Sequence, residues 1–121
     1  MYREADSTGM ERPEAVRAYY RAIDEDDYET LSDLLAGGFV HRRPDTVIEG
    51  REEFVAFMRG GRPERDTSHE LSAVYGDSGR IAAEGTLYRS DGTAWFGFVD
   101  TFGFVASGIS EIRTYTDAHP E

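Results

Sequence analysis

The second half of the chain constrains the fold most, because it is a succession of strand-like segments joined by short turns. Residues 69–75, 79–89, 93–104 and 109–117 are rich in β-branched and aromatic side chains. The stretches GDSG, SDG and VASG separate them, and short glycine-containing connections of this kind join antiparallel neighbours. We therefore expect an antiparallel meander over this half.

The first half carries the period of helices. Apolar residues recur at i, i+3, i+4 and i+7 from Val16 to Ile23, behind Pro13, which predicts a helix over residues 12–24. Helical spacing also predicts a short helix over 28–35 and a third over 51–59, with Gly37-Gly38 and Gly60-Gly61 expected to end them. Between these two helices, "FVHRR" at 39–43 predicts a strand that Pro44 stops.

Helices followed by long antiparallel strands are typical of an α+β domain, with the sheet curled around the first helix. At 121 residues the chain suits one domain. We expect that domain to span residues 10–118 and the polar residues 1–9 to be frayed.

Charge and composition exclude several classes of function. The chain has no cysteine and only three histidines, at positions 41, 69 and 119, so neither thiolate chemistry nor a metal site is expected. The formal net charge is −11, and every basic residue is arginine. Such a surface repels nucleic acid and anionic membranes. No segment has the character of a secretory signal or a membrane span, so we expect a cytoplasmic protein.

An acidic, lysine-free surface is also typical of proteins from salt-accumulating halophiles, in which high salt screens self-repulsion. The alternative is an ordinary acidic protein encoded by a GC-rich genome. The dependence of stability on salt concentration separates these two interpretations.

One carboxylate stands out in the apolar run "AWFGFVDTFGF" at 94–104. In a strand, Asp100 shares a face with Phe96, Phe98, Phe102 and Phe104, while Trp95 and Val99 face the other way. Asp100 is then either a structural carboxylate held by Arg43 or by backbone donors, or an ionisable group in a dry aromatic pocket. Burial in such a pocket raises the pKa of a carboxyl group and suits it to acid or base catalysis.

The order of elements, with "YYRAIDEDDYETLSDLLAGGFVHRRP", "IEGREEFVAFM" and "FVDTFGFVASGISEIRTY", resembles the nuclear-transport-factor-two-like superfamily, which includes ketosteroid isomerases and SnoaL-like polyketide cyclases. The resemblance covers residues 11–117. It implies a cone-shaped, curved antiparallel (mixed) sheet wrapped around a long N-terminal helix. It also implies a deep pocket without a cofactor and a homodimer formed through the outer sheet face.

The resemblance assigns roles to three positions. Tyr19 and Asp100 fall where ketosteroid isomerases keep the tyrosine and the protonated acid of their oxyanion hole. Arg43 stands directly before Pro44, where those enzymes keep the general-base aspartate. Because arginine cannot abstract a proton at neutral pH, steroid isomerisation by that mechanism is disfavoured. SnoaL-like cyclases use an aspartate on the sheet as acid and base, and here that role falls to Asp100.

Each remaining candidate has two interpretations. Arg43 lies at a solvent-exposed strand end or enters the pocket to bind an anion. His41 and His69 are ordinary hydrogen-bonded histidines or pocket groups, and His69 is the better donor candidate because it begins a strand at the mouth of the cone. Tyr19 is a core aromatic or a donor to an oxyanion.

Trp95 and Val99 are expected on an outer face buried in a dimer. The expected ligand pocket further includes Phe39, Phe54, Met58, Phe98, Phe102 and Ile112.

Two hypotheses follow from these residues. In the first, the chain binds a small apolar molecule with a carbonyl or anionic group and catalyses isomerisation or cyclisation by proton transfer next to the carbonyl. Asp100 is then the acid/base, Tyr19 and His69 are donors, and Arg43 stabilises the negative charge. In the second, it is a non-catalytic ligand-binding or dimeric interaction module. Epoxide hydrolysis is disfavoured because no Asp–Arg–Asp set is evident.

Overall fold

The computed structural model describes residues 11–62, 66–76 and 79–117, so the segment 1–9 that we expected to be frayed lies outside the described residues. The elements follow in the order α1 (Arg12–Asp24), α2 (Tyr28–Leu34), β1 (Leu35–Arg42), β2 (Val47–Glu49), α3 (Arg51–Ala56), η1 (Phe57–Gly61), β3 (Ser68–Gly76), β4 (Arg80–Tyr88), β5 (Ala94–Val105) and β6 (Gly108–Thr116).

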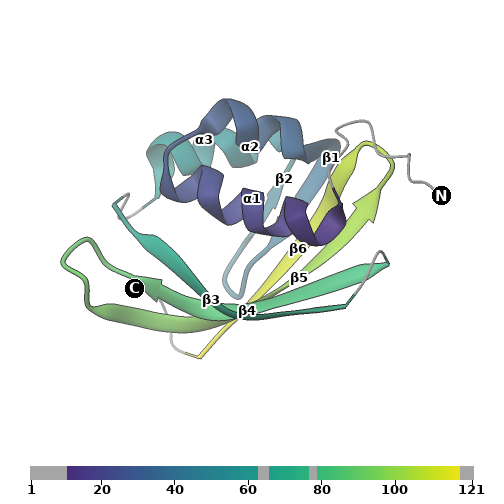
Figure 1. Cartoon of the computed structure of the whole chain (residues 1–121). Helices are drawn as coiled ribbons and strands as arrows, with labels where there is room; N and C mark the ends of the chain where they lie inside the picture. The colour runs from purple at the N-terminus through teal and green to yellow at the C-terminus, as the bar shows by residue number, and fades with distance from the viewer. Residues whose placement is uncertain (1–10, 63–65, 77–78, 118–121) are drawn as a thin grey trace.

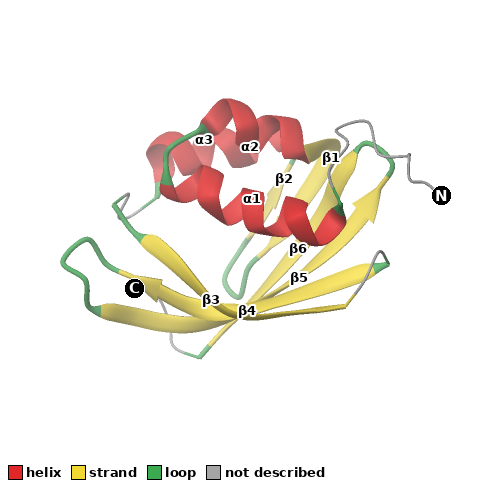
Figure 2. Cartoon of the chain, viewed as in Figure 1, coloured by secondary structure: helices red, strands yellow, loops and turns green. Residues whose placement is uncertain are grey.

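The strands form one six-stranded sheet in the order β2-β1-β6-β5-β4-β3. The last four strands make the predicted antiparallel meander, whereas β1 pairs with β6 in parallel, so the sheet is mixed. The helices lie together on one side of the curved sheet (Figures 1 and 2). The predicted α+β class is therefore confirmed.

Helix α1 has the predicted bounds because its sequence supplies both a start and a buried stripe. Pro13 occupies the first turn, where its missing N–H costs no hydrogen bond. The stripe from Val16 to Ile23 is buried against the sheet. Helix α2 begins at an N-cap, Asp27, whose side chain accepts a hydrogen bond from the Thr30 backbone N–H at 3.2 Å. None of the helices in the described part of the chain is long and apolar enough to cross a membrane.

The structure corrects the predicted role of Gly37 and Gly38. Helix α2 ends at Leu34, and both glycines lie inside β1, outside the left-handed region. The helix ends early because Leu35 is already extended and pairs with Ile109 of β6. The register of β1 against β6 then shifts between Leu35 and Val40, and the two glycines occupy that irregular stretch.

Two further elements differ from the prediction. Strand β2 was not predicted, because three residues are too few to show an alternating pattern. The third helix begins at Arg51 as predicted but is α-helical only to Ala56, and residues Phe57–Gly61 continue it as a π-helical turn. Gly60 and Gly61 therefore lie within this turn.

The core lies between the helices and the concave part of the sheet. Phe39, Phe54, Phe102 and Ile112 are completely buried there. The Phe39 and Phe54 rings lie 4.9 Å apart, centroid to centroid, in edge-to-face contact. These four residues were predicted to line the ligand pocket. They instead pack in the core and are absent from the cavity lining described below.

Candidate functional site

A cavity of about 120 Å³ lies between the helices and the sheet. Its wall combines apolar side chains with several polar and charged groups. The lining residues are Tyr19, Ile23, His41, Arg43, Pro44, Phe57, Met58, Arg62, Thr67, His69, Leu87, Trp95, Phe96, Phe98, Asp100, Thr114 and Thr116. All four residues predicted to act in catalysis therefore line this cavity. Of the predicted pocket residues, His41, Met58 and Phe98 line it.

Asp100 points into the interior, as strand alternation predicts, and only 6% of the residue is exposed. Its Oδ2 accepts a hydrogen bond from the Tyr20 hydroxyl at 2.5 Å, and its Oδ1 accepts one from the Thr114 hydroxyl at 2.5 Å. Burial raises the pKa of this carboxyl group, and the two hydrogen bonds together with the charges of His69 and Arg43 oppose that rise. Each oxygen keeps a second lone pair.

The tyrosine bonded to Asp100 is Tyr20, whereas the sequence predicted Tyr19 as a pocket donor to an oxyanion. The Tyr20 ring lies at 5.0 Å from His69 and 5.7 Å from Phe98, with its hydroxyl on the carboxylate. Tyr19 lines the cavity instead, and among the described residues its hydroxyl has no hydrogen-bond partner. Burial and the Asp100 charge raise the pKa of both tyrosines, so both hydroxyls remain protonated.

His41 extends the network behind Asp100. Its Nε2 lies 2.8 Å from the Thr114 hydroxyl oxygen. Because the single Thr114 hydrogen is donated to Asp100, His41 must donate from Nε2. Its Nδ1 is then an acceptor, and this buried atom has no partner within the described ranges. Burial, helped by the Arg43 charge, lowers the pKa of His41 to about 3, so the imidazole is neutral.

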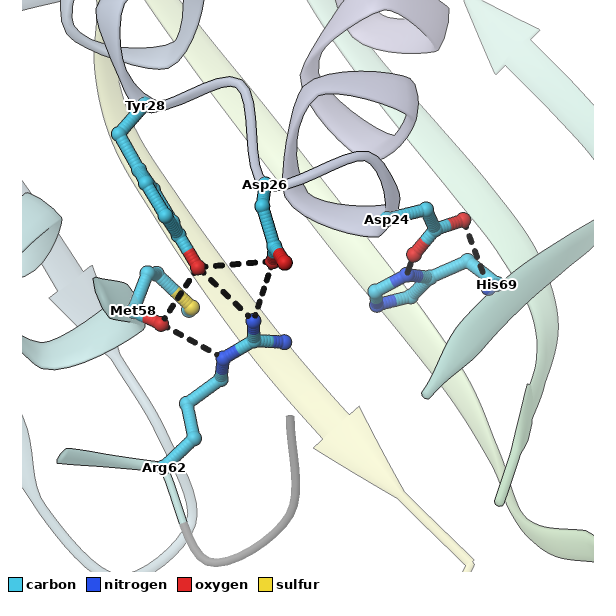
Figure 3. A network of polar contacts seen from close by, with 6 residues as sticks. All are labelled: Asp24, Asp26, Tyr28, Met58, Arg62 and His69. Atoms are coloured by element: carbon cyan, nitrogen blue, oxygen red, sulfur yellow. Dashed lines mark hydrogen bonds and ion pairs between the residues drawn. The ribbon is translucent and has the colours of Figure 1, made fainter. Parts of the chain in front are cut away.

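His69 is fixed by a carboxylate from another element. Its ring Nδ1 lies 2.7 Å from Oδ1 of Asp24, and its backbone N–H donates to Oδ2 at 3.0 Å (Figure 3). A carboxylate only accepts, so the Nδ1 proton faces Asp24 and Nε2 is the nitrogen left for the cavity. This pairing of the end of α1 with the start of β3 fixes the orientation of the His69 ring at the cavity.

The two arginines on the cavity wall do not touch Asp100. The Arg43 guanidinium lies 5.3 Å above the Phe57 ring centroid and 3.9 Å from Asp45. Arg43 thus enters the cavity wall, and no ion pair with Asp100 is formed in the described structure. Arg62, which the sequence analysis did not single out, donates from Nε to the Met58 carbonyl at 2.9 Å and lies 3.5 Å from Asp26 (Figure 3).

Trp95 lies on the cavity wall, whereas alternation predicted it on the outer face. The pairing of β4 with β5 shifts here, since Tyr88 pairs with Ala94 and Leu87 with Phe96. Trp95 is the extra residue of this bulge, and a bulge redirects side chains. Val99 is exposed, as the outward orientation predicted by alternation requires, and its burial in a dimer stays a prediction. Where the structure describes the chain, no group of His, Asp and Glu side chains is arranged to hold a metal ion.

The curved mixed sheet, the covering helices and the cavity between them define a class of pocket-forming α+β domains. The family model for the SnoaL-like domain matches residues 16–112. The chain therefore belongs to the SnoaL-like family, within the nuclear-transport-factor-two-like fold. Among proteins with curated descriptions, none matches this chain.

Solved structures share the fold. A putative ketosteroid isomerase from Kribbella flavida aligns with a TM-score of 0.78 and 20% identity, over 91% of this chain and 79% of that one. An epoxide hydrolase from M. tuberculosis aligns at 0.70 and 20% identity, over 85% and 80%. A nuclear-transport-factor-two-like protein of unknown function from Cytophaga hutchinsonii aligns at 0.76 and 12% identity, over 97% and 95%. At these identities the likeness establishes the fold.

Proposed function

We propose that this SnoaL-like domain binds a small, largely apolar molecule and catalyses cofactor-free proton transfer next to a carbonyl, leading to isomerisation or cyclisation. One observation carries the proposal: a buried carboxylate, Asp100, lies on the wall of a mostly apolar cavity and is held there by two hydroxyl donors. Its raised pKa brings it closer to the range in which a carboxyl group exchanges protons at neutral pH.

In this mechanism the Asp100 carboxylate takes a proton from the carbon next to the carbonyl. The electrons of the broken C–H bond form an enolate, whose oxygen accepts a hydrogen bond from the unpaired Tyr19 hydroxyl. His69, when protonated, donates from Nε2, and Arg43 adds positive charge. Return of the proton to another carbon completes an isomerisation. In a cyclisation the enolate carbon bonds to the carbon of a second carbonyl, whose oxygen takes the electron pair of the broken π bond and then the proton held by Asp100.

The test uses cyclohexanone, a ring of the size the cavity can hold. In D₂O, NMR follows the exchange of its α-protons, and we expect the protein to accelerate exchange above the buffer rate. Asp100→Asn removes the base and should lower that acceleration by about 10²-fold or more. The matched control is Asp91→Asn, which alters an exposed carboxylate in the β4–β5 turn. Equal exchange by wild type and Asp100→Asn would exclude Asp100 as the base.

A second candidate function is ligand binding without chemistry. It is favoured by Arg43, which stands where ketosteroid isomerases keep their base, and by the hydrogen bonds that already occupy both oxygens of Asp100. In that case cyclohexanone binds, as detected by ligand NMR, but its α-protons exchange at the buffer rate. An NMR titration of Asp100 would then give an ordinary carboxyl pKa.

The proposed function includes a homodimer formed through the outer face of the sheet. Tyr75, Val99 and Tyr115 are exposed there. Val99 pairs with Tyr115 across β5 and β6, and the Tyr75 hydroxyl donates to Glu84, which pairs with Val99. These side chains therefore share one face, and an apolar face ringed by polar groups is typical of an interface.

A further inference from the structure

Two arginines from distant segments meet on the same turn at the cavity wall. Arg43 directly follows β1, and Arg62 directly follows η1. Arg43 lies over the Phe57 ring, while Arg62 donates to the carbonyl of the next residue, Met58. All four residues line the cavity. The π-helical turn therefore holds two positive charges on one side of the pocket, and such turns are frequent at functional sites.

The turn fixes both guanidiniums. A Cβ added at Gly61 would lie 2.9 Å from the Phe57 ring, so that ring packs directly against the turn. Arg62 is also held by the Tyr28 hydroxyl at 3.4 Å, and only 8% of its side chain is exposed (Figure 3). A buried arginine with few rotamers open to it loses little entropy when it binds a ligand.

Both guanidiniums keep donors for a ligand. The contacts of Arg62 use its Nε and Nη2, and across the described residues Nη1 has no partner. Arg43 has one carboxylate neighbour, Asp45, at a long 3.9 Å, and that carboxylate is 71% exposed. A guanidinium carries five N–H donors in a fork that matches a carboxylate.

Two further groups of the cavity wall are also able to donate. The hydroxyls of Tyr19 and of buried Thr67 line it, and neither has a hydrogen-bond partner in the described ranges. Asp100 already accepts two hydrogen bonds. The charges of both Arg43 and Arg62 oppose the rise in the pKa of Tyr19, so their fields converge at its hydroxyl. These donors, on the same cavity wall as the two guanidiniums, suit an anion.

We propose that the ligand of this cavity is a single-ring compound bearing a carboxylate, which lies between Arg43 and Arg62. The cavity volume of about 120 Å³ limits the ligand to one ring, since a cavity of roughly 150 Å³ holds one benzene molecule. This inference rests on the proposed function, because it assigns the ligand class of the same pocket. It also explains how a chain of net charge −11 can bind an anion, namely through direct contacts shielded from the acidic exterior.

The test compares benzoate with benzamide, a neutral molecule of nearly the same shape, by isothermal titration calorimetry at fixed ionic strength. We expect benzoate to bind at least 10-fold more tightly. Arg43→Gln and Arg62→Gln should each weaken benzoate binding about 10-fold or more and leave benzamide within twofold. The matched control is Arg59→Gln, which removes the same charge from the same turn but lies over the Tyr28 ring outside the cavity.

The outcomes separate this inference from the proposed function. Equal affinity for benzoate and benzamide would overturn the carboxylate site, while cyclohexanone exchange would still report on proton transfer. Loss of benzoate binding in Arg59→Gln to the same extent would also overturn it, because general charge would then be the cause. Should Arg62→Gln fail to unfold cooperatively, the selectivity of the wild type and the Arg43→Gln variant decide the matter.

Discussion

His41 is neutral in the folded chain and becomes charged in the unfolded chain at mildly acidic pH. Burial lowers its folded pKa to about 3, against 6.5 for the free side chain. The buried neutral imidazole therefore makes its full contribution to the free energy of unfolding above pH 6.5. That contribution is lost as the pH falls from 6.5 towards 3. Within that window the loss reaches roughly 1.4 kcal/mol per pH unit.

Replacing His41 by glutamine should remove this acid-induced loss, because glutamine stays neutral and keeps an amide donor for Thr114. Urea unfolding of wild type and variant at pH 7 and pH 4.5 measures the change in unfolding free energy between these two pH values. We expect the variant to lose less unfolding free energy than wild type between the two values, although it is less stable at pH 7. Identical pH dependence would show that His41 is not the neutral, buried histidine described above.

At the residue scale, the sequence predicts the direction of a side chain better than its hydrogen-bond partners. The inward direction of Asp100 follows from strand alternation. Its partners do not, because a hairpin closed at Val105 and Gly108 and continued without irregularity would place Arg113 opposite Asp100. The register shift between Gly103 and Phe104 brings Thr114 there instead. The pairing of His69 with Asp24, 45 positions apart, leaves no local signal in the sequence.

At the element scale, long periodic segments were predictable and irregular ones were not. The stripe of α1 and the four meander strands are periodic over many residues, so their bounds were predicted closely. The bulge at Trp95 and the π-helical turn each break a period within a few residues. Both breaks contribute residues to the cavity wall, Trp95 from the bulge and Phe57 and Met58 from the turn, and no pattern in the sequence signals either break.

At the element scale, the close approach of β3 to β4 leaves no space for a side chain at Gly85. A Cβ there would lie 2.3 Å from the Glu70 carbonyl oxygen, and backbone cannot move aside as a flexible side chain can. Gly85→Ala should therefore destabilise the fold by about 1–3 kcal/mol and displace the strand that carries His69. Urea unfolding measures the change.

The matched control for Gly85 is Gly37→Ala in β1. Nothing lies within 4 Å of a Cβ at Gly37, and its φ is not in the left-handed region. This variant should stay within about 1 kcal/mol of wild type, because a smaller unfolded-state entropy offsets any minor strain. Comparable destabilisation by both substitutions would mean that the β3–β4 spacing is not the cause.

At the scale of the whole molecule, net charge opposes both folding and association. The chain carries a formal charge of −11, and the proposed dimer would bring two such charges together. The Debye length falls from about 10 Å at 0.1 M salt to about 3 Å at 1 M. Raising KCl over this range should increase both the free energy of unfolding and the dimer fraction, measured by urea unfolding and sedimentation equilibrium.

Sucrose at matched osmolality is the control for salt, because it favours the compact state without screening charge. Val99→Asp should keep the chain monomeric at 1 M KCl, since it places a charge on the proposed interface. Stability that stays constant from low to high KCl would argue against halophilic adaptation and leave an ordinary acidic protein.

The position of β6 between β1 and β5 governs when the molecule can assemble. Residues 108–116 are the last strand within the described ranges, yet they join β1, the strand beside the helices, to the meander. Until this segment leaves the ribosome, the β1–β2 pair and the three earlier meander strands cannot belong to one continuous sheet. Thr114, on this strand, is then the final hydrogen-bond donor to reach Asp100. Pairings between such distant segments fold slowly, so the cavity stays incomplete during translation until residues 108–116 have emerged and paired with both neighbours.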